Sequence, residues 1–267
     1  MMLPAVPETF EWIAQPWGSA LRCRPLAALA PHLFTTRQLA LSGTAAERQL
    51  AESVGARQLV MVNQVHGNVV VVVRSGGSGE ADAPGRDPGT RVAADALVSD
   101  DRDRAIAVRA ADCVPLLMAD RRRGVVAAVH AGWRGTAARA AIAAVNALGR
   151  EFGTQPADLV VAIGPSIGPC CYEVGSDLVD AFAAAGHERH LIQRWFATPP
   201  PRRGSRVQPP LRLDVAGANR DQLMLAGVGE EAIHMSALCT AMHLDVLTSY
   251  RVEKEKAGRL VAAIRPA

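Results

Sequence analysis

The chain has 267 residues, of which 49% are hydrophobic, so it is long enough to bury a substantial core. Its 29 basic and 26 acidic side chains leave a formal net charge of +3, a balance too even to indicate nucleic acid or a membrane surface as a partner. No apolar run approaches the roughly 20 residues of a membrane-spanning helix, and the N-terminus does not resemble a signal peptide. The 5 cysteines fit no disulfide framework, which favours a reducing cytoplasm.

The first half of the chain is rich in apolar, β-branched runs. A helix is expected early, at residues 42–51, and the loop-forming composition of residues 75–91 predicts a flexible loop. The basic run at 121–123 stands before a glycine and predicts a hairpin turn. Continuous apolar character predicts strands covered on both faces, at residues 58–65, 68–74, 94–99, 105–110, 114–119 and 125–130.

The second half alternates between helical and strand patterns. Helices are expected at 136–152, 176–185, 190–196 and 216–226, and strands at 158–163, 231–235, 247–251 and 259–264. A proline-rich stretch at 198–210 predicts a second flexible loop. We interpret residues 1–267 as a single α/β domain with a mixed sheet, because a first half made mostly of strands argues against a simple doubly wound fold.

Three side chains that bind borderline or soft metals lie at the ends of predicted strands. His66 follows the first of these strands, Cys113 lies between the strands at 105–110 and 114–119, and His130 ends the last one. Strand ends of this kind can converge in a layered sheet. Two imidazoles and one thiolate are one ligand short of a closed structural zinc site, which matches a catalytic zinc with an open position for water or substrate.

The same residues also suit nucleophilic catalysis. A thiolate on Cys113 with His130 as its base would form a Cys-His dyad, and Asp112 or Asn63 would orient the base. Spacing alone does not separate a zinc ligand set from a dyad, so both hypotheses stand.

Two glycine-rich turns lead from strands into helices. Residues 130–135 (His-Ala-Gly-Trp-Arg-Gly) enter a predicted helix, where free backbone N–H groups favour an anion and Arg134 offers a bidentate contact to phosphate. Residues 164–175 form a second such turn, and loops of this kind shape pockets. Its adjacent cysteines, Cys170 and Cys171, lack the Cys-x-x-Cys spacing of common metal sites.

Several motifs follow one another in the order of a known family. They are Gln-Val-His-Gly at 64–67, Ala-Asp-Ala-Leu-Val-Ser at 94–99, Ala-Asp-Cys-Val-Pro at 111–115, His-Ala-Gly-Trp-Arg-Gly at 130–135, the Gly-Pro-Cys-Cys-Tyr-Glu-Val-Gly type of loop at 164–175, Leu-Asp-Val-Ala-Gly-Ala-Asn-Arg at 213–220 and Ser-Tyr-Arg at 249–251. The chain resembles the laccase-domain, polyphenol-oxidase-like family, whose members are also described as purine nucleoside phosphorylases and as a peptidoglycan editing factor. The resemblance implies an α/β/β/α layered sandwich with a mixed sheet, like the cysteine-hydrolase fold of some deamidating toxins.

The resemblance also implies a chemistry. It implies zinc, with copper as the alternative, on His66, Cys113 and His130. It implies phosphorolysis of adenosine, inosine and methylthioadenosine, with adenosine deamination as a second activity, so the partners are a purine nucleoside and phosphate. Copper-dependent phenol oxidation is also attributed to the family, but one His-Cys-His trio has too few ligands for a multicopper cluster.

Roles for individual residues follow from this hypothesis. For phosphorolysis, Arg37 and Arg134 would position phosphate against the ribose anomeric carbon. The leaving purine would need a proton donor, for which Asp112, Asn63 and Gln64 are candidates. The candidate catalytic residues are Cys113, His130, His66 and Asp112, and the candidate substrate-binding residues are Arg37, Asn63, Gln64, Arg134 and Arg251.

One stretch departs from the family pattern. The family has a Ser-Thr-Arg-x-Gly-Gly stretch and then a long loop, whereas residues 34–39 (Phe-Thr-Thr-Arg-Gln-Leu) keep the arginine and lack the Gly-Gly and most of the loop. The missing loop motivates the hypothesis of a non-catalytic binding protein that has kept the fold. The candidate Cys113–His130 dyad motivates another, an amide hydrolase in peptidoglycan precursor editing, with Cys113 as nucleophile and His130 as base.

Overall fold

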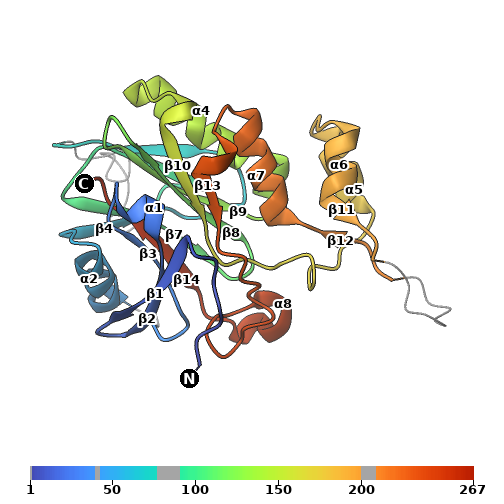
Figure 1. Ribbon diagram of the computed structural model, residues 1–267, viewed down its shortest axis with the longest axis horizontal. Coiled ribbons are helices and arrows are strands. Elements are labelled where there is room, and N and C mark those ends of the chain that lie inside the picture. The colour runs from blue at the N-terminus through green and yellow to red at the C-terminus, as the bar shows by residue number, and fades with distance from the viewer. Residues whose placement is uncertain (1, 40–42, 77–90, 200–208) are drawn as a thin grey trace.

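Two six-stranded mixed sheets form the centre of the molecule (Figure 1). The computed structural model describes residues 2–39, 43–76, 91–199 and 209–267. In the first sheet all neighbouring strands are antiparallel except β4 and β7. Its order is β1 (Phe10–Gln15), β2 (Gly18–Cys23), β3 (His32–Thr35), β14 (Leu260–Ile264), β7 (Arg104–Ala110) and β4 (Gln58–Met61).

The second sheet carries most of the continuous apolar runs. Its neighbours are antiparallel except at its two edges, where β13 pairs with β10 and β5 pairs with β6 in parallel. Its order is β13 (Ile233–Met235), β10 (Leu159–Ile163), β8 (Val114–Asp120), β9 (Val126–Ala131), β6 (Ala96–Ser99) and β5 (Val70–Val73). A short separate pair joins β11 (Phe196–Ala197) to β12 (Arg212–Leu213).

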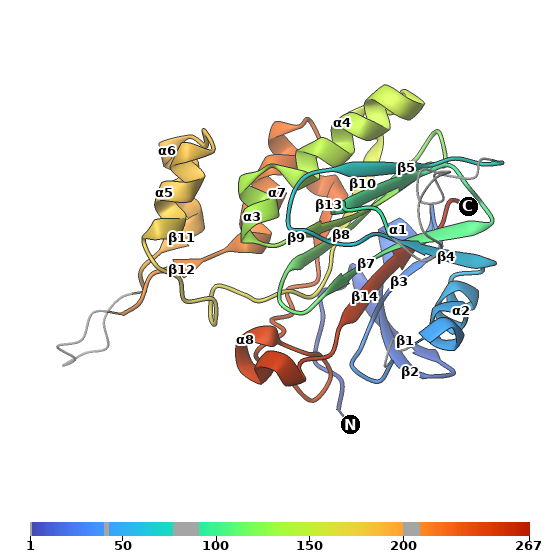
Figure 2. The same ribbon diagram turned by 180° about the vertical axis from the view of Figure 1, so that it is seen from behind.

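Helices cover the outer faces of both sheets (Figure 2). α4 (Ala140–Phe152) and α7 (Val215–Leu225) pack on the second sheet, and α2 (Gly43–Ser53) packs on the first. A third cluster of buried side chains, which includes Phe34 and Leu117, fills the space between the sheets. The remaining helices are α1 (Arg24–Ala27), α3 (Trp133–Ala137), α5 (Asp177–Ala184), α6 (Arg189–Trp195) and α8 (Tyr250–Glu253).

The layer order is therefore helix, sheet, sheet, helix, as the family resemblance implied. The further likeness to deamidating toxins stays a prediction. Within the described residues, no helix combines the length and apolar character needed to cross a bilayer.

Most predicted elements are confirmed, with ends that shift by a few residues. All the central strands expected between residues 58 and 130 are present, and the basic run at 121–123 is the turn between β8 and β9. The helix expected at 42–51 is α2. Most of the two predicted flexible loops, at 75–91 and 198–210, lies outside the described residues.

One predicted helix is interrupted and one predicted strand is wrong. The helix expected at 136–152 is present but breaks into α3 and α4, because Arg139 takes a left-handed conformation with φ of 60° and its guanidinium donates to the Ala185 and Gly186 carbonyls. The strand expected at 247–251 is absent from this described segment, which instead leads into α8. The N-terminal strands β1, β2 and β3 were not predicted at all.

Candidate metal centre and its cavities

Two imidazoles and one thiol meet where three strands end. His66 follows β4, Cys113 precedes β8 and His130 lies near the end of β9, and their ligand atoms all lie within 4.8 Å of one another. The His66 and His130 rings stand edge to face with centroids 5.0 Å apart. A His-Cys-His set with three ligands suits zinc in a catalytic, open arrangement, so the residues present fit the metal that the sequence indicates.

The backbone on both sides of this cluster is strained. His66 has φ of 63° and Asp112 has φ of 90°, conformations that residues other than glycine rarely adopt. Such strain persists only where the surroundings hold it, and it is common at functional sites. Here it turns the His66 ring and the Cys113 side chain toward each other.

Asp95, which directly precedes β6, holds this arrangement in place through hydrogen bonds. The sequence analysis did not assign it a role. Its carboxylate is fully buried and accepts from His130 Nδ1 at 2.9 Å. It also accepts backbone N–H groups of His66 at 2.9 Å, Gly67 at 2.6 Å and Val65 at 3.3 Å. A proton fixed on Nδ1 leaves Nε2 of His130 free for a metal, as in the carboxylate–histidine–zinc arrangement.

The electrostatics of the trio favour an anionic sulfur. Burial raises the pKa of the Cys113 thiol, but hydrogen bonds from His130 and His66 outweigh it and bring the pKa to about 7. Burial lowers the pKa of His130, but hydrogen bonds to Asp95 and Cys113 raise it to about 9. Burial likewise raises the pKa of Asp95, and its hydrogen bonds from His130, Gly67 and His66 bring it below its usual range. A thiolate ready at neutral pH is what both a metal site and a nucleophile need.

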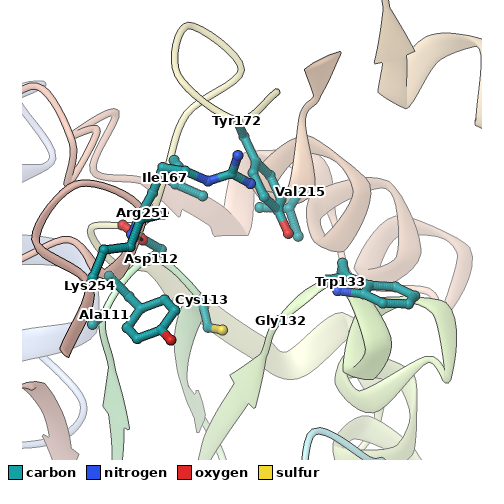
Figure 3. Close-up of a pocket in the computed structure, with 11 residues that line it drawn as sticks. Ala111, Asp112, Cys113, Gly132, Trp133, Ile167, Tyr172, Val215, Arg251 and Lys254 are labelled. Atoms are coloured by element: carbon teal, nitrogen blue, oxygen red, sulfur yellow. Dashed lines mark hydrogen bonds between the residues drawn. The ribbon is translucent and has the colours of Figure 1, made fainter. Parts of the chain in front are cut away.

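A cavity of about 320 Å³ opens on one side of Cys113. Aromatic and aliphatic side chains form much of its wall, and Figure 3 shows the Cys113 sulfur directed toward Gly132. A Cβ atom on Gly132 would lie 2.7 Å from that sulfur, so only glycine lets the backbone come this close. The lining residues besides these two are Ala111, Asp112, Trp133, Ile167, Tyr172, Val215, Tyr250, Arg251 and Lys254.

A second cavity, of about 570 Å³, lies against the histidines of the trio. It shares Ala111, Cys113 and Tyr250 with the first cavity. Its remaining lining is mostly polar and comprises Gln64, His66, Arg109, Ala110, His130, Glu255 and Arg259.

Arg109 distinguishes this second cavity, and neither it nor Arg259 was predicted. Its side chain is half-buried, and within the described residues the guanidinium makes no hydrogen bond or ion pair. Burial and the charges of Arg91 and Arg259 lower its pKa. Arg109 lies within the predicted strand at 105–110, a segment to which the sequence analysis assigned no site residue.

Some of the predicted site residues lie at the cavities in supporting positions. Asp112 accepts from Thr240 Oγ1 and from the Arg251 backbone N–H, both at 2.6 Å. Arg251 lies over the Tyr172 ring, with Cζ 5.1 Å from the centroid (Figure 3). Gln64 donates to the Arg109 carbonyl at 2.7 Å and accepts the Arg109 N–H at 2.9 Å, so it fixes the backbone under the second cavity.

The structure does not bring the other three predicted residues to a cavity wall. Arg37 pairs with Glu253 at 2.9 Å, and Arg134 stacks on Trp133 with Cζ 4.3 Å from the ring centroid. The Asn63 side chain is exposed. Among the described residues that line the two cavities, none of these three is found.

Comparison with known proteins agrees with this architecture. Residues 40–266 match the family described as multi-copper polyphenol oxidoreductase laccase, and the chain belongs to this family. It superposes on the crystal structure of YlmD from Geobacillus stearothermophilus with a TM-score of 0.78, 30% sequence identity and coverage of 97% of this chain and 99% of that one.

Related sequences carry enzyme names. A purine nucleoside phosphorylase of Deinococcus radiodurans is 35% identical over 254 residues, which are 88% of each chain. A purine nucleoside phosphorylase of Bacteroides thetaiotaomicron is 34% identical over 172 residues, but this covers only 60% of that protein and 64% of this chain. An adenosine deaminase, RL5, from an unknown prokaryotic organism is 38% identical over 146 residues, or 55% of this chain and 52% of that protein.

Proposed function

We propose that this protein is a metal-dependent purine nucleoside phosphorylase that also deaminates adenosine. The observation that carries the proposal is the position of the His66, Cys113 and His130 cluster, which lies between an aromatic cavity and an arginine-lined cavity. A phosphorylase needs this combination, because a planar base and a phosphate must approach the same sugar carbon. The names of the related proteins support the same assignment.

The first cavity suits the purine nucleoside. Trp133 and Tyr172 offer ring faces, and Ile167 and Val215 add apolar surface. Aromatic and aliphatic walls stabilise a flat heterocycle by contact area and by stacking. Arg251, held over Tyr172, would contact the polar edge of the bound nucleoside.

The second cavity suits phosphate. Within the described residues, the Arg109 guanidinium makes no hydrogen bond or ion pair. The positive charges of Arg91 and Arg259 lie near it and repel it, so a bound anion would stabilise this group. Arg37 and Arg134 remain predicted phosphate ligands, but their guanidinium groups already contact Glu253 and Trp133. Arg109 and Arg259 are therefore the better candidates.

His66, Cys113 and His130 would hold the metal, and zinc there would supply Lewis acidity and activate water for deamination. Asp95 keeps the proton of His130 on Nδ1 and holds residues 65–67 in place. Both Asp112 oxygens accept short hydrogen bonds, so this carboxylate is committed to orienting Thr240 and Arg251. Its predicted role as the acid for the leaving purine is accordingly weakened and stays a prediction. The donor set also supports zinc over a multicopper cluster, since the described residues contain one group with both imidazole and thiol ligands.

An amide hydrolase remains the second candidate, because one observation favours it. Cys113, His130 and Asp95 form a continuous thiol–imidazole–carboxylate chain with the pKa of the thiol at about 7. That chain has the nucleophile, base and orienting group of a cysteine hydrolase. The two candidates differ in their need for metal.

The test is product analysis of adenosine turnover by zinc-loaded and by chelated protein, with and without inorganic phosphate. We expect adenine and ribose 1-phosphate only with phosphate, inosine without it, and neither product after chelation. Zinc-loaded protein that turns over no nucleoside would overturn the proposal. Amide hydrolysis that survives chelation and is lost on alkylation of Cys113 would establish the alternative.

A variant separates the two cavities. Arg109→Gln should raise the KM for phosphate at least about tenfold, because it removes a charged hydrogen-bond donor, and it should leave phosphate-independent deamination unchanged. Arg121→Gln, in the exposed turn between β8 and β9, is the matched control and should change neither. Equal phosphate KM values in Arg109→Gln and the control would remove Arg109 from the phosphate site.

A further inference from the structure

Three of the cysteines gather away from the His66, Cys113 and His130 centre. Cys170 and Cys171 belong to the loop that follows β10, and Cys239 follows β13 far along the chain. Their sulfur atoms all lie within 4.8 Å of one another. We propose that these three thiols form a second metal site, which binds a soft monovalent cation, Cu⁺.

The backbone builds this cluster rather than leaving it to flexible side chains. Ser166 and Cys239 form a parallel bridge, in which the Thr240 N–H donates to the Ser166 carbonyl at 3.0 Å. The Cys171 N–H donates to the Gly168 carbonyl at 3.0 Å, which folds the loop back over Cys239.

Gly168 lies against two of the three sulfurs, those of Cys170 and Cys239. Its N–H donates to Cys239 Sγ at 3.3 Å, a contact that strengthens when that sulfur is anionic. A Cβ atom on Gly168 would lie 3.3 Å from Cys170 Sγ and 3.4 Å from Cys239 Cβ, so a side chain at this position would crowd the cluster. The close approach of Cys170 and Cys239 therefore favours a glycine at this position.

An arginine lies beside the cluster. Arg212 of β12 donates to the Cys170 carbonyl and pairs with Glu173 at 3.3 Å. Its Nε atom is buried and has no hydrogen-bond partner within the described residues. Glu173 offsets the charge of this guanidinium, so Arg212 fixes the Cys170 backbone and leaves one buried N–H donor without a partner among these residues.

A metal ion replaces the thiol protons when it binds, so one ion would engage all three adjacent sulfurs.

The donor set selects the ion. Structural zinc is almost always four-coordinate, and within the described residues this group contains three ligands and no histidine or carboxylate. The only carboxylate lining the adjoining cavity of about 300 Å³, Asp214, instead caps α7 by accepting the Gly217 N–H at 2.8 Å. Three thiolates without a harder ligand favour Cu⁺, and the Met235 thioether lines the same cavity.

Occupancy would stiffen one wall of the nucleoside cavity, a consequence that rests on the proposed function. Tyr172 follows Cys171 directly, and the Ile167 N–H donates to the Asp112 carbonyl at 2.9 Å. Both Tyr172 and Ile167 line that cavity. The cation would therefore tie this wall to the segment that carries Cys239.

The test is a Cu⁺ titration of reduced, zinc-loaded full-length protein without oxygen, against bicinchoninate as competing chelator. We expect one Cu⁺ retained per chain without release of zinc, and at least about 100-fold weaker retention in Cys239→Ser and in Cys170→Ser. Cys23→Ala, which removes a thiol buried at the end of β2, is the control and should bind as the wild type does.

One further measurement keeps the outcome decisive. X-ray absorption of the copper-loaded protein should show a shell of sulfur only. A nitrogen shell, zinc release, equal retention by Cys239→Ser, or no retention by folded wild-type protein would each overturn the proposal. None of these readings requires nucleoside turnover, so the second site and the phosphorylase can fail independently.

Discussion

Replacing Asp95 with asparagine tests the foundation of the metal centre with almost no change in shape. The carboxylate uses one oxygen for His130 Nδ1 and the His66 N–H, and the other for the Gly67 and Val65 N–H groups. An amide has only one acceptor oxygen, so whichever way it rotates its NH₂ group must face two donors.

Each orientation damages a different half of the site. If the NH₂ group faces His130, the imidazole regains a partner only by moving its proton to Nε2, the atom that a metal needs. If it faces the turn, the Gly67 and Val65 N–H groups lose a charged acceptor. Two hydrogen bonds to a charged group, at about 1.5–3 kcal/mol each, give a loss of about 3–6 kcal/mol in the free energy of unfolding.

The metal affinity should fall as well. Partners that orient a ligand histidine are worth about 10- to 100-fold in affinity, or about 1.4–2.8 kcal/mol. The assays are urea unfolding of metal-free protein and competition of Asp95→Asn with a zinc-binding chromophore. Asp101→Asn is the matched control, because Asp101 is also buried and accepts from the Asp103 N–H and Arg104 Nε, away from the centre. The control should lose stability and keep its zinc affinity. Wild-type zinc affinity in folded Asp95→Asn would refute the reasoning.

Three other predictions concern the core, the pH dependence and the nucleoside cavity. A Cβ on Gly164 would lie 2.3 Å from the Phe34 ring, so Gly164→Ala should lower the free energy of unfolding in urea by about 1–3 kcal/mol. Gly149→Ala, inside α4, is the control and should raise it by up to about 1 kcal/mol. Equal stabilities of the two variants would contradict this. Burial lowers the pKa of His32 to about 4. The unfolded chain therefore takes up a proton near pH 6.5 and the folded protein does not, so stability is complete above this pH and falls below it, by about 2 kcal/mol at about pH 5. His32→Gln should remove this part of the pH dependence, and an unchanged urea-unfolding profile between about pH 5 and 7.5 would count against it. Tyr172→Ala should raise the KM for adenosine at least about tenfold and leave that for phosphate unchanged in steady-state assays, and the reverse pattern would exchange the two cavities.

The central strands were predictable because burial on both faces leaves a direct signal. β8 and β9 read as unbroken apolar runs, and their ends fall within a residue or so of the expected positions. The strand β1 gives no such signal, since most of its residues are only partly buried. This explains why the edge strand β1 escaped detection. The interior strands β2 and β3 were missed as well, although β3 is fully buried, and β3 has only 4 residues.

The predicted helix at 136–152 and the predicted strand at 247–251 differ from the structure because of contacts that the local sequence does not encode. Nothing in the alanine-rich sequence around Arg139 breaks a helix, and the break depends on carbonyls of Ala185 and Gly186 in another part of the chain. The segment at 247–251 contains one β-branched residue, Thr248, and one tyrosine, which favour a strand. However, Glu253 accepts from Thr248 Oγ1 at 2.7 Å and from the Ser249 N–H at 3.0 Å. This local capping starts α8 and overrides strand propensity.

The trio of His66, Cys113 and His130 could be proposed because metal-binding residue types stood at strand ends. Asp95 could not be assigned, since a lone aspartate inside the predicted strand at 94–99 shows no functional pattern until its partners are seen. The same limit applies to Cys239, which joins Cys170 and Cys171 only through the Ser166 bridge.

The metal centre and the fold depend on each other through one carboxylate. His66 adopts its left-handed conformation beside three consecutive N–H groups that all point at Asp95. This turn alone would be unfavourable, and the buried Asp95 charge alone would be unfavourable as well. The N–H groups of the turn stabilise the buried Asp95 charge, and that charge stabilises the strained turn. The hydrogen bond from Asp95 to His130 then orients the imidazoles toward Cys113. Because these groups are paired before any ligand arrives, the protein can present a preorganised ligand set, and metal affinity should follow the stability of the 65–67 turn across variants at this site.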